Sequence, residues 1–192
     1  HAPEVDQIIR EKYPYMIDYY PWFNSGLSVY AQEPSAVISN APKLLFFDEN
    51  GFESLHWNND SVFRRKGIAA TGDFAILIDS TMEYASGFEM KAADLKLKKG
   101  TSFEIAVYGC FEASCNDMQL VFSVERGGEN VLWRNAVLSQ YITQPDKWMP
   151  AYFGYTIVED VRPDDRVKVY FYNPSKKTMR IDDFRMRIVD GI

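Results

Sequence analysis

The sequence has few of the residue types on which most catalytic and metal-binding motifs depend. It contains only two cysteines and two histidines among 192 residues. It has no Gly-x-Ser-x-Gly nucleophile motif, and neither His1 nor His56 lies in a recognisable catalytic-triad setting. Its one Gly-Gly pair falls between two predicted strands, where it cannot serve as a phosphate-binding loop. These absences favour a protein without catalytic activity.

Long apolar runs and strong basic clusters are also missing. No stretch reaches the roughly 18 apolar residues of a membrane-spanning helix, so we expect no membrane span in this chain. The net charge is −6, and the only basic runs are residues 64–66 and 96–99. A field of this sign repels phosphate backbones, which argues against a nucleic-acid partner. The chain starts at His1, from which we expect a trimmed product or an excised region.

The two cysteines, Cys110 and Cys115, lie in a short connection between two strand-like runs. A disulfide across such a loop is geometrically easy and would indicate an oxidising compartment. Two free thiols are the main alternative. A zinc half-site is a third, although no other cysteine is available to complete it.

What the sequence does have is a high apolar content and many short strand-like runs. Apolar residues make up 46% of the chain and aromatic residues 15%, enough for a packed core. In several runs apolar and polar residues alternate, as in half-buried antiparallel strands. Turn residues separate the runs, and no long helix is expected among them. The sequence therefore predicts an all-β fold, an antiparallel two-sheet β-sandwich. The expected strands are residues 43–47, 61–66, 73–78, 88–95, 102–108, 118–125, 131–138, 149–158, 166–172 and 179–188.

The first 40 residues differ from the rest. Val5, Ile8, Ile9 and Tyr13 have helical spacing, and Pro14 ends that pattern. An aromatic-rich segment, residues 15–23, follows. We therefore expect a domain division into residues 1–40, a helix and connection packed on the sandwich, and residues 41–192, the sandwich itself. The alternative is that the aromatic segment docks on a partner protein.

Three short motifs carry a resemblance to a known class of domains. They are an opening Phe-Asp-Glu-Asn-Gly-Phe-Glu segment at residues 47–53 followed by Trp57, a Thr-Gly-Asp-Phe turn at residues 71–74, and a closing strand with an Asp-Asp pair at residues 180–188. From Leu44 onward the chain resembles the jelly-roll β-sandwiches of carbohydrate-binding modules and galactose-binding domains. The resemblance concerns the fold more than the function.

The resemblance implies a structural calcium ion near the first and last strands. The expected ligands are Asp48, Glu53 and Asp183, with Glu49 and Asp182 as alternatives, because calcium prefers hard oxygen ligands. A different role is open to Asp182 and Asp183, which could cap a strand bulge through backbone hydrogen bonds. No other cofactor is expected.

A candidate ligand site comes from aromatic residues that fall on the non-core phase of predicted strands. Tyr170 and Tyr172 alternate with apolar residues of one strand, and Trp133 and Tyr152 are further candidates. Aromatic rings at a surface stack on the apolar faces of sugars, although they also fill the second face of many sandwiches. The leading hypothesis is a non-catalytic carbohydrate-binding module, extracytoplasmic and part of a larger bacterial surface or periplasmic system. The first alternative is a structural or protein-interaction sandwich that is appended to a membrane or multidomain protein and contacts other protein domains. The second is a glycan-active enzyme.

Overall fold

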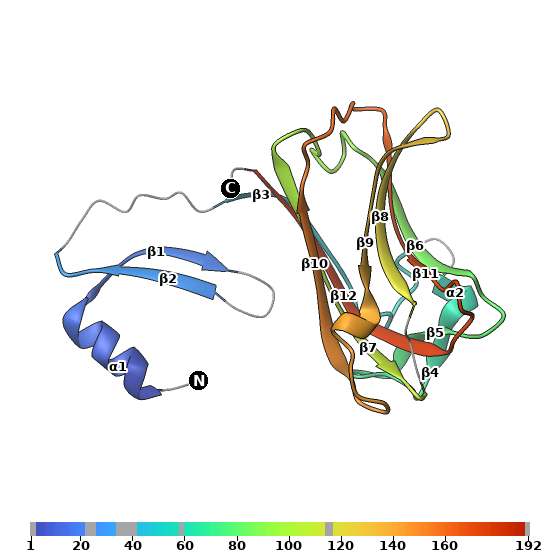
Figure 1. Ribbon diagram of the computed structural model, residues 1–192, viewed down its shortest axis with the longest axis horizontal. Coiled ribbons are helices and arrows are strands. Elements are labelled where there is room, and N and C mark those ends of the chain that lie inside the picture. The colour runs from blue at the N-terminus through green and yellow to red at the C-terminus, as the bar shows by residue number, and fades with distance from the viewer. Residues whose placement is uncertain (1–2, 22–25, 34–41, 58–59, 114–116, 191–192) are drawn as a thin grey trace. The chain divides into compact units, whose positions relative to one another are not determined.

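The computed structural model describes residues 3–21, 26–33, 42–57, 60–113 and 117–190 of the chain, which forms two compact units (Figure 1). The larger unit comprises residues 44–190, and the smaller one contains the N-terminal 43 residues. Among the described residues no helix is both long and apolar enough to cross a membrane.

The N-terminal unit contains one helix and a two-stranded hairpin. The helix α1 (Pro3–Lys12) agrees with the helical spacing of the apolar residues in this segment. It ends two residues before Pro14, the residue that was expected to stop it. Strands β1 (Tyr15–Pro21) and β2 (Gly26–Ala31) then pair antiparallel. From the sequence we expected an aromatic-rich connection here and no strands. Pro21 is accommodated because it stands at the end of its strand, opposite Gly26.

The larger unit is a sandwich of two sheets, which confirms the predicted fold class. The six-stranded sheet has the order β10-β7-β12-β5-β4, and β3 also pairs with β12. The four-stranded sheet has the order β6-β11-β8-β9. The first sheet consists of β3 (Lys43–Asn50), β4 (Arg64–Lys66), β5 (Phe74–Ile78), β7 (Thr101–Phe111), β10 (Met149–Thr156) and β12 (Met179–Asp190). The second consists of β6 (Tyr84–Lys91), β8 (Gln119–Arg126), β9 (Glu129–Val137) and β11 (Arg166–Tyr172).

Two predicted strands differ from what the structure shows. The expected strand at residues 61–66 is half helical, since the short helix α2 (Asp60–Phe63) precedes β4. Only Arg64–Lys66 of this segment pair with a neighbouring strand, which is β5. The expected strand at residues 88–95 begins earlier, at Tyr84, and ends at Lys91, after which the chain turns.

The core lies between the two sheets and follows the alternation seen in the sequence. Phe103, Ile105 and Val107 of β7 face inward, as do Leu120, Phe122 and Val124 of β8, and all six are buried. The rings of Phe103 and Phe122 stack with their centroids 3.7 Å apart. Each fully buried side chain of this size contributes about 1.5 to 3 kcal/mol of transfer free energy, so this interface carries much of the fold's stability.

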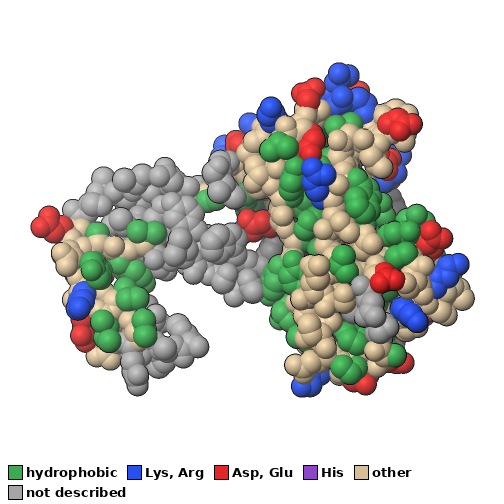
Figure 2. All heavy atoms as spheres, viewed as in Figure 1, with side chains coloured by type: hydrophobic (Ala, Val, Ile, Leu, Met, Phe, Trp, Pro, Cys, Tyr) green, Lys and Arg blue, Asp and Glu red, His purple; other side chains and the backbone are tan. Residues whose placement is uncertain are grey.

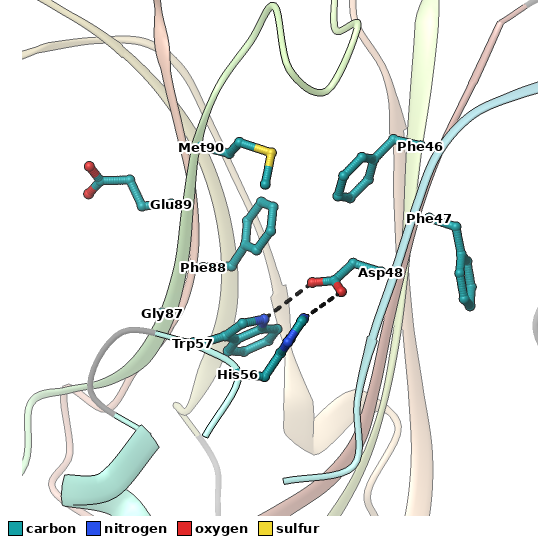
Figure 3. Close-up of a pocket in the computed structure, with 9 residues that line it drawn as sticks. All are labelled: Phe46, Phe47, Asp48, His56, Trp57, Gly87, Phe88, Glu89 and Met90. Atoms are coloured by element: carbon teal, nitrogen blue, oxygen red, sulfur yellow. Dashed lines mark hydrogen bonds and ion pairs between the residues drawn. The ribbon is translucent and has the colours of Figure 1, made fainter. Parts of the chain in front are cut away.

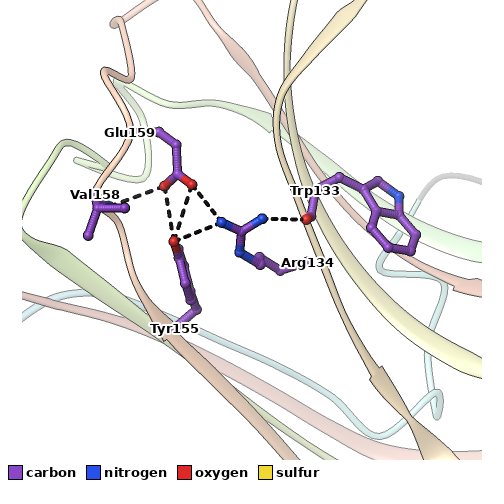
Figure 4. A network of polar contacts seen from close by, with 5 residues as sticks. All are labelled: Trp133, Arg134, Tyr155, Val158 and Glu159. Carbon is purple, nitrogen blue, oxygen red and sulfur yellow. Dashed lines mark hydrogen bonds and ion pairs between the residues drawn. The ribbon is translucent and has the colours of Figure 1, made fainter.

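At one side of the sandwich, a polar cluster bridges the edge strands β9 and β10 (Figure 4). The guanidinium of Arg134 donates to Tyr155 Oη at 2.9 Å and to Glu159 Oε1 at 2.8 Å. The same guanidinium lies over the Tyr155 ring, 4.6 Å from its centroid. The backbone N–H of Val158 donates to the other oxygen of Glu159. The cluster therefore ties one sheet to the other where no strand ladder can.

Charged side chains gather at one end of the larger unit. Figure 2 shows Lys and Arg side chains and Asp and Glu side chains gathered at the end of the unit where the β6–β7, β8–β9 and β10–β11 connections lie (Figure 1). One ion pair there is well buried on its acidic side. Both oxygens of Asp165 accept hydrogen bonds from Arg126, at 2.8 and 2.7 Å, and the Arg162 N–H adds a third.

Candidate functional site

The outer face of the four-stranded sheet gathers most of the predicted ligand-binding residues. Because side chains alternate along a strand, the residues between the core positions point away from the core. The pairing register places them in rows across the four strands. We call this surface the outer face. Its residues are Tyr84, Gly87 and Glu89 of β6, Lys168, Tyr170 and Tyr172 of β11, Gln119, Val121, Ser123 and Glu125 of β8, and Trp133 and Asn135 of β9.

Three tyrosines form an aromatic cluster at one end of the outer face. Tyr84 stacks on Tyr172 with ring centroids 5.1 Å apart and planes 21° apart. Tyr84 also meets Tyr170 at 6.0 Å in a tilted arrangement. Desolvation raises the pKa of Tyr84 above its ordinary value of 10.0, and the nearby Glu83 carboxylate raises it further. Tyr84 remains 58% exposed, which leaves its ring available to a ligand.

Trp133 continues this aromatic surface toward β9. Its indole Nε1 donates a hydrogen bond to Tyr170 Oη at 3.2 Å, so the two rings lie side by side above β8. Figure 4 shows Trp133 and Arg134 on opposite sides of β9. Trp133 is 37% exposed. The structure thus brings together three of the four aromatic residues predicted from the sequence.

A hollow of about 500 Å³ lies on the outer face, on the β6 side of Tyr170. It exists because Gly87 stands opposite Tyr170 in the ladder and has no side chain to fill the space. A Cβ on Gly87 would make only ordinary contacts, the nearest at 3.4 Å. The hollow is therefore open enough to admit part of a ligand next to an exposed ring. Its lining consists of Tyr84, Gly87, Phe88, Glu89, Glu125, Lys168, Val169 and Tyr170.

Charged residues border the hollow on the side away from Tyr172, and they occur as ion pairs. Lys168 Nζ lies 2.7 Å from Glu125 Oε2, and the two side chains are 31% and 25% exposed. Arg166 Nη1 lies 3.0 Å from Glu89 Oε1. Both cations are thus neutralised by a carboxylate. The hollow offers hydrogen-bonding groups without a net positive charge.

Tyr152, the fourth predicted aromatic residue, does not join the outer face. It belongs to β10 of the other sheet, where it pairs with Ala106. Its neighbours Ala151 and Phe153 lie on the core-facing phase, so Tyr152 points from the opposite side of the sandwich. The sequence could not separate Tyr152 from Tyr170, because nothing local to a strand states which sheet it will join.

The acids expected to bind calcium accept hydrogen bonds from different protein donors. Asp48 accepts from His56 Nε2 at 2.8 Å and from Trp57 Nε1 at 3.2 Å. Glu53 Oε1 accepts from the backbone N–H groups of Asp73 and Phe74, which form the predicted turn. Within the described ranges, no three acidic, histidine or cysteine side chains come together in a way that could hold a metal ion. The described acids therefore do not form a ready-made calcium site, and calcium stays a prediction.

The Asp182-Asp183 pair does what the alternative hypothesis proposed. Strand β12 has an irregularity between Asp182 and Arg185, and Asp183 has a φ of 47°. The buried Asp182 carboxylate accepts from the N–H groups of Ala70, Thr71 and Asp183. Burial raises the pKa of Asp182, against the lowering effect of these three donors. The pair thus anchors a strand bulge to the loop before β5.

A second, smaller hollow of about 290 Å³ lies near the edge strand β6 (Figure 3). Phe88 and Met90 of β6 point toward Phe46 and Asp48 of β3, whereas Glu89 and Phe47 point away. Trp57 closes the hollow, with its ring 6.1 Å from that of Phe88. Aromatic rings supply most of its walls, and the Asp48 carboxylate is bonded to His56 and Trp57.

Cys110 is buried on β7, and an Arg180 N–H lies 3.1 Å from its sulfur. Burial raises the pKa of the Cys110 thiol, although Arg180 opposes this effect. Its predicted partner, Cys115, lies outside the described residues. The Cys110 thiol is free in this structure, and the disulfide stays a prediction for protein made in an oxidising compartment.

Comparisons with known proteins found similarity in fold alone. No family model and no curated protein matches the chain. One similar structure is the CBM22-1-GH10 part of endo-1,4-beta-D-xylanase 10B from Clostridium thermocellum, complexed with xylohexaose. It is 10% identical with a TM-score of 0.43, and the alignment covers 76% of this chain and 26% of that one. Another is the CBM22-1 xylan-binding domain of Paenibacillus barcinonensis Xyn10C: 18% identity, a TM-score of 0.45, 79% of this chain and 98% of that one. A third is an arabinose-bound MgGH51 α-L-arabinofuranosidase: 8% identity, a TM-score of 0.49, 91% of this chain and 29% of that one.

The chain thus spans about a quarter of the first structure's length and nearly all of the second. The first two structures contain modules of the class that the sequence resembles. The jelly-roll β-sandwich implied by that resemblance is confirmed by the two sheets described above. At these identities the likeness assigns no ligand to this chain.

Sequence reasoning missed two residues that shape the outer face, Tyr84 and Gly87. Both precede the residue at which strand β6 was expected to begin. The signal was weak, because a glycine inside a short run looks like a turn residue and not like the floor of a site. Tyr84 could have been found from its alternation with the buried Ala85, had the strand been extended to it.

Proposed function

We propose that this protein is a non-catalytic carbohydrate-binding module that holds an uncharged polysaccharide chain on the outer face of its four-stranded sheet. The observation that carries the proposal is the hollow beside Tyr170, together with the aromatic rings that border it. An exposed ring provides the flat apolar surface that a pyranose ring stacks on. Polar groups around the ring satisfy the sugar hydroxyls and fix the ligand's orientation.

The charges around the hollow favour a ligand without charge. Lys168 of the outer face and the neighbouring Arg166 each lie beside a carboxylate. An acidic sugar would have to break one of these pairs and would also meet the net charge of −6. A neutral sugar keeps both pairs and uses their remaining hydrogen-bonding capacity.

We further propose that the module works outside the cytoplasm, within a larger bacterial surface or periplasmic system. Polysaccharide chains are too large to cross a membrane freely, so a protein that binds them meets them outside. The resemblance of the sequence to carbohydrate-binding modules supports this placement, because such modules are commonly attached to other domains.

The test is a binding assay with defined polysaccharides. Affinity electrophoresis should be run with neutral polysaccharides such as a soluble xylan and a β-glucan, and with a polyuronic acid for comparison. We expect retardation by at least one neutral polymer and none by the acidic one. Binding to the acidic polymer alone would contradict the proposed ligand class, and retardation by none of a broad neutral panel would contradict carbohydrate binding.

Two tyrosine variants locate the binding surface. Tyr172→Ala should weaken binding at least tenfold while lowering the free energy of unfolding by only about 1 kcal/mol, the scale of one aromatic pair. Tyr152→Ala is the matched control, because it makes the same substitution on the other sheet and should leave binding unchanged. A loss of about 3 to 5 kcal/mol in Tyr172→Ala would mean that this ring is buried as a core residue is, and would contradict the site.

A further inference from the structure

Ser123 lies in the middle of the outer face and has an unusual environment. Its side chain is fully buried, and its Oγ has no hydrogen-bond partner. Among the described residues, no other buried side-chain oxygen or nitrogen lacks a hydrogen-bond partner. Leaving a buried hydroxyl unpaired is unfavourable, because the group has lost its hydrogen bonds to water and gained none in the protein. Such a group requires a physical explanation.

The residues beside Ser123 explain why water does not reach it. The ladder places Trp133 of β9 on one side of it and Lys168 of β11 on the other. Neither pairs with the hydroxyl, since Trp133 Nε1 donates to Tyr170 Oη and Lys168 Nζ binds Glu125. The polar atoms of both neighbours are thus engaged away from Ser123, and their side chains flank it.

The Trp133–Tyr170 hydrogen bond is the weakest element of this arrangement. It joins two neutral groups at 3.2 Å, and Trp133 is 37% exposed, so water can replace the bond when the indole turns outward. Turning the indole outward would uncover Ser123 Oγ. It would also release Trp133 Nε1 and Tyr170 Oη, so one movement provides three hydrogen-bonding groups within two adjacent rows of the sheet.

We propose that Ser123 is a ligand-binding residue of the outer face, which a neutral glycan reaches when the Trp133 indole turns away from Tyr170. The Ser123 hydroxyl then exchanges a hydrogen bond with a sugar hydroxyl, and the indole packs against the bound chain. This inference rests on the proposed function, which it deepens by adding a polar contact at the floor of the site. It also explains why an unpaired hydroxyl is kept there in the absence of ligand.

The decisive variant is Ser123→Ala, because its effects on stability and on binding have opposite signs. Removing an unpaired buried hydroxyl should leave the melting temperature unchanged or raise it. Affinity for the neutral polysaccharide that the wild-type protein binds should fall about fivefold to tenfold, the effect of one lost hydrogen bond. The matched control is Ser102→Ala. Ser102 is also buried, but its Oγ lies 2.7 Å from Thr156 Oγ1, so this variant should melt at a lower temperature and bind normally.

Tryptophan fluorescence reports the movement itself. The wild-type emission should change when the polysaccharide is added, and most of that change should be absent in Trp133→Phe. Wild-type binding with unchanged affinity in Ser123→Ala would overturn the inference and leave the proposed function standing. Wild-type binding without an emission change from Trp133 would overturn the proposed movement. If the wild-type protein binds no neutral polysaccharide, the proposed function fails and this inference fails with it.

Discussion

Gly87 of β6 stands directly opposite Tyr170 of β11, so the most exposed hollow of the outer face begins where a side chain is missing. Its nearest neighbours would accept a methyl group, since a Cβ would lie 3.4 Å from the Val169 carbonyl oxygen and 3.7 Å from the Tyr170 Cβ. Anything longer must extend into the hollow.

Replacing Gly87 should therefore affect binding in proportion to side-chain size. We expect Gly87→Ala to bind slightly more weakly than wild type, and Gly87→Leu to lose binding at least tenfold. The free energy of unfolding should stay within about 1 kcal/mol, since glycine is itself unfavourable in a strand. Binding and thermal unfolding should be measured on the same samples. Full binding by the leucine variant would show that the ligand does not use the hollow.

The Arg126–Asp165 pair predicts a defined dependence of stability on pH. The hydrogen bonds from Arg126 hold the pKa of Asp165 below its ordinary value of 3.8. A carboxylate whose pKa is lower in the folded state stabilises the fold above the unfolded pKa and loses that contribution as the pH falls through the folded pKa. We expect Asp165→Asn to lower the free energy of unfolding by about 1.5 to 3 kcal/mol at pH 7.

The difference between wild type and Asp165→Asn should begin to shrink when the pH falls below about 4, because Asp165 of the unfolded chain is then protonated while the folded chain binds this proton only at lower pH. Urea unfolding at pH 7 and at pH 3 measures this difference. The control is Asp164→Asn, which changes the exposed neighbouring acid and should behave as wild type at both pH values. An equal difference at both pH values would contradict the assignment.

Calcium binding remains a prediction of the resemblance. If the ion is present, excess chelator should lower the melting temperature, because a ligand bound only by the folded state stabilises it. Asp183→Ala should have the same effect, and chelator should then add little to it. A wild-type melting curve that does not move in excess chelator would rule out a stabilising ion.

The disulfide prediction concerns a very short loop. A bond between Cys110 and Cys115 should add about 2 kcal/mol or somewhat less, because closing so few residues removes little entropy from the unfolded chain. Thiol titration of protein made in an oxidising compartment, unfolded without reductant, provides the measurement. Two titratable thiols per chain would contradict the prediction.

The sequence was sufficient for the fold wherever the evidence was local. Alternation along β7, β8 and β11 predicted which residues face the core, because such a strand shows its orientation in every second residue. It did not predict that Ala106 of β7 and Val121 of β8, on the opposite phase, are buried as well. The helix α1 could also be predicted from local spacing, in this case the helical spacing of its apolar residues. The hairpin of β1 and β2 was missed, because its aromatic-rich residues were interpreted as a connection.

The site was less accessible to sequence reasoning, because it depends on which strands become neighbours. Tyr152 and Tyr170 have similar local surroundings, yet they lie on different sheets. Gly87 acquires its role only through pairing with Tyr170, next to a register shift that no pattern within β6 reveals. Ser123 looked like any polar residue of an alternating strand, and only its three-dimensional environment shows that its hydroxyl has no partner.

The alternation of β9 also has a mechanical consequence. Trp133 faces outward to the proposed ligand, while the next residue, Arg134, crosses to Tyr155 and Glu159 on the other sheet. Tension on a polysaccharide held at Trp133 would therefore pass along the backbone to Arg134, which is hydrogen-bonded to Tyr155 of β10 and to Glu159 in the loop after β10. An edge strand is normally the easiest one to peel from a sandwich, since only one neighbour holds it. Here the edge strand that would bear the load, β9, is also hydrogen-bonded to the opposite sheet through Arg134 and Tyr155.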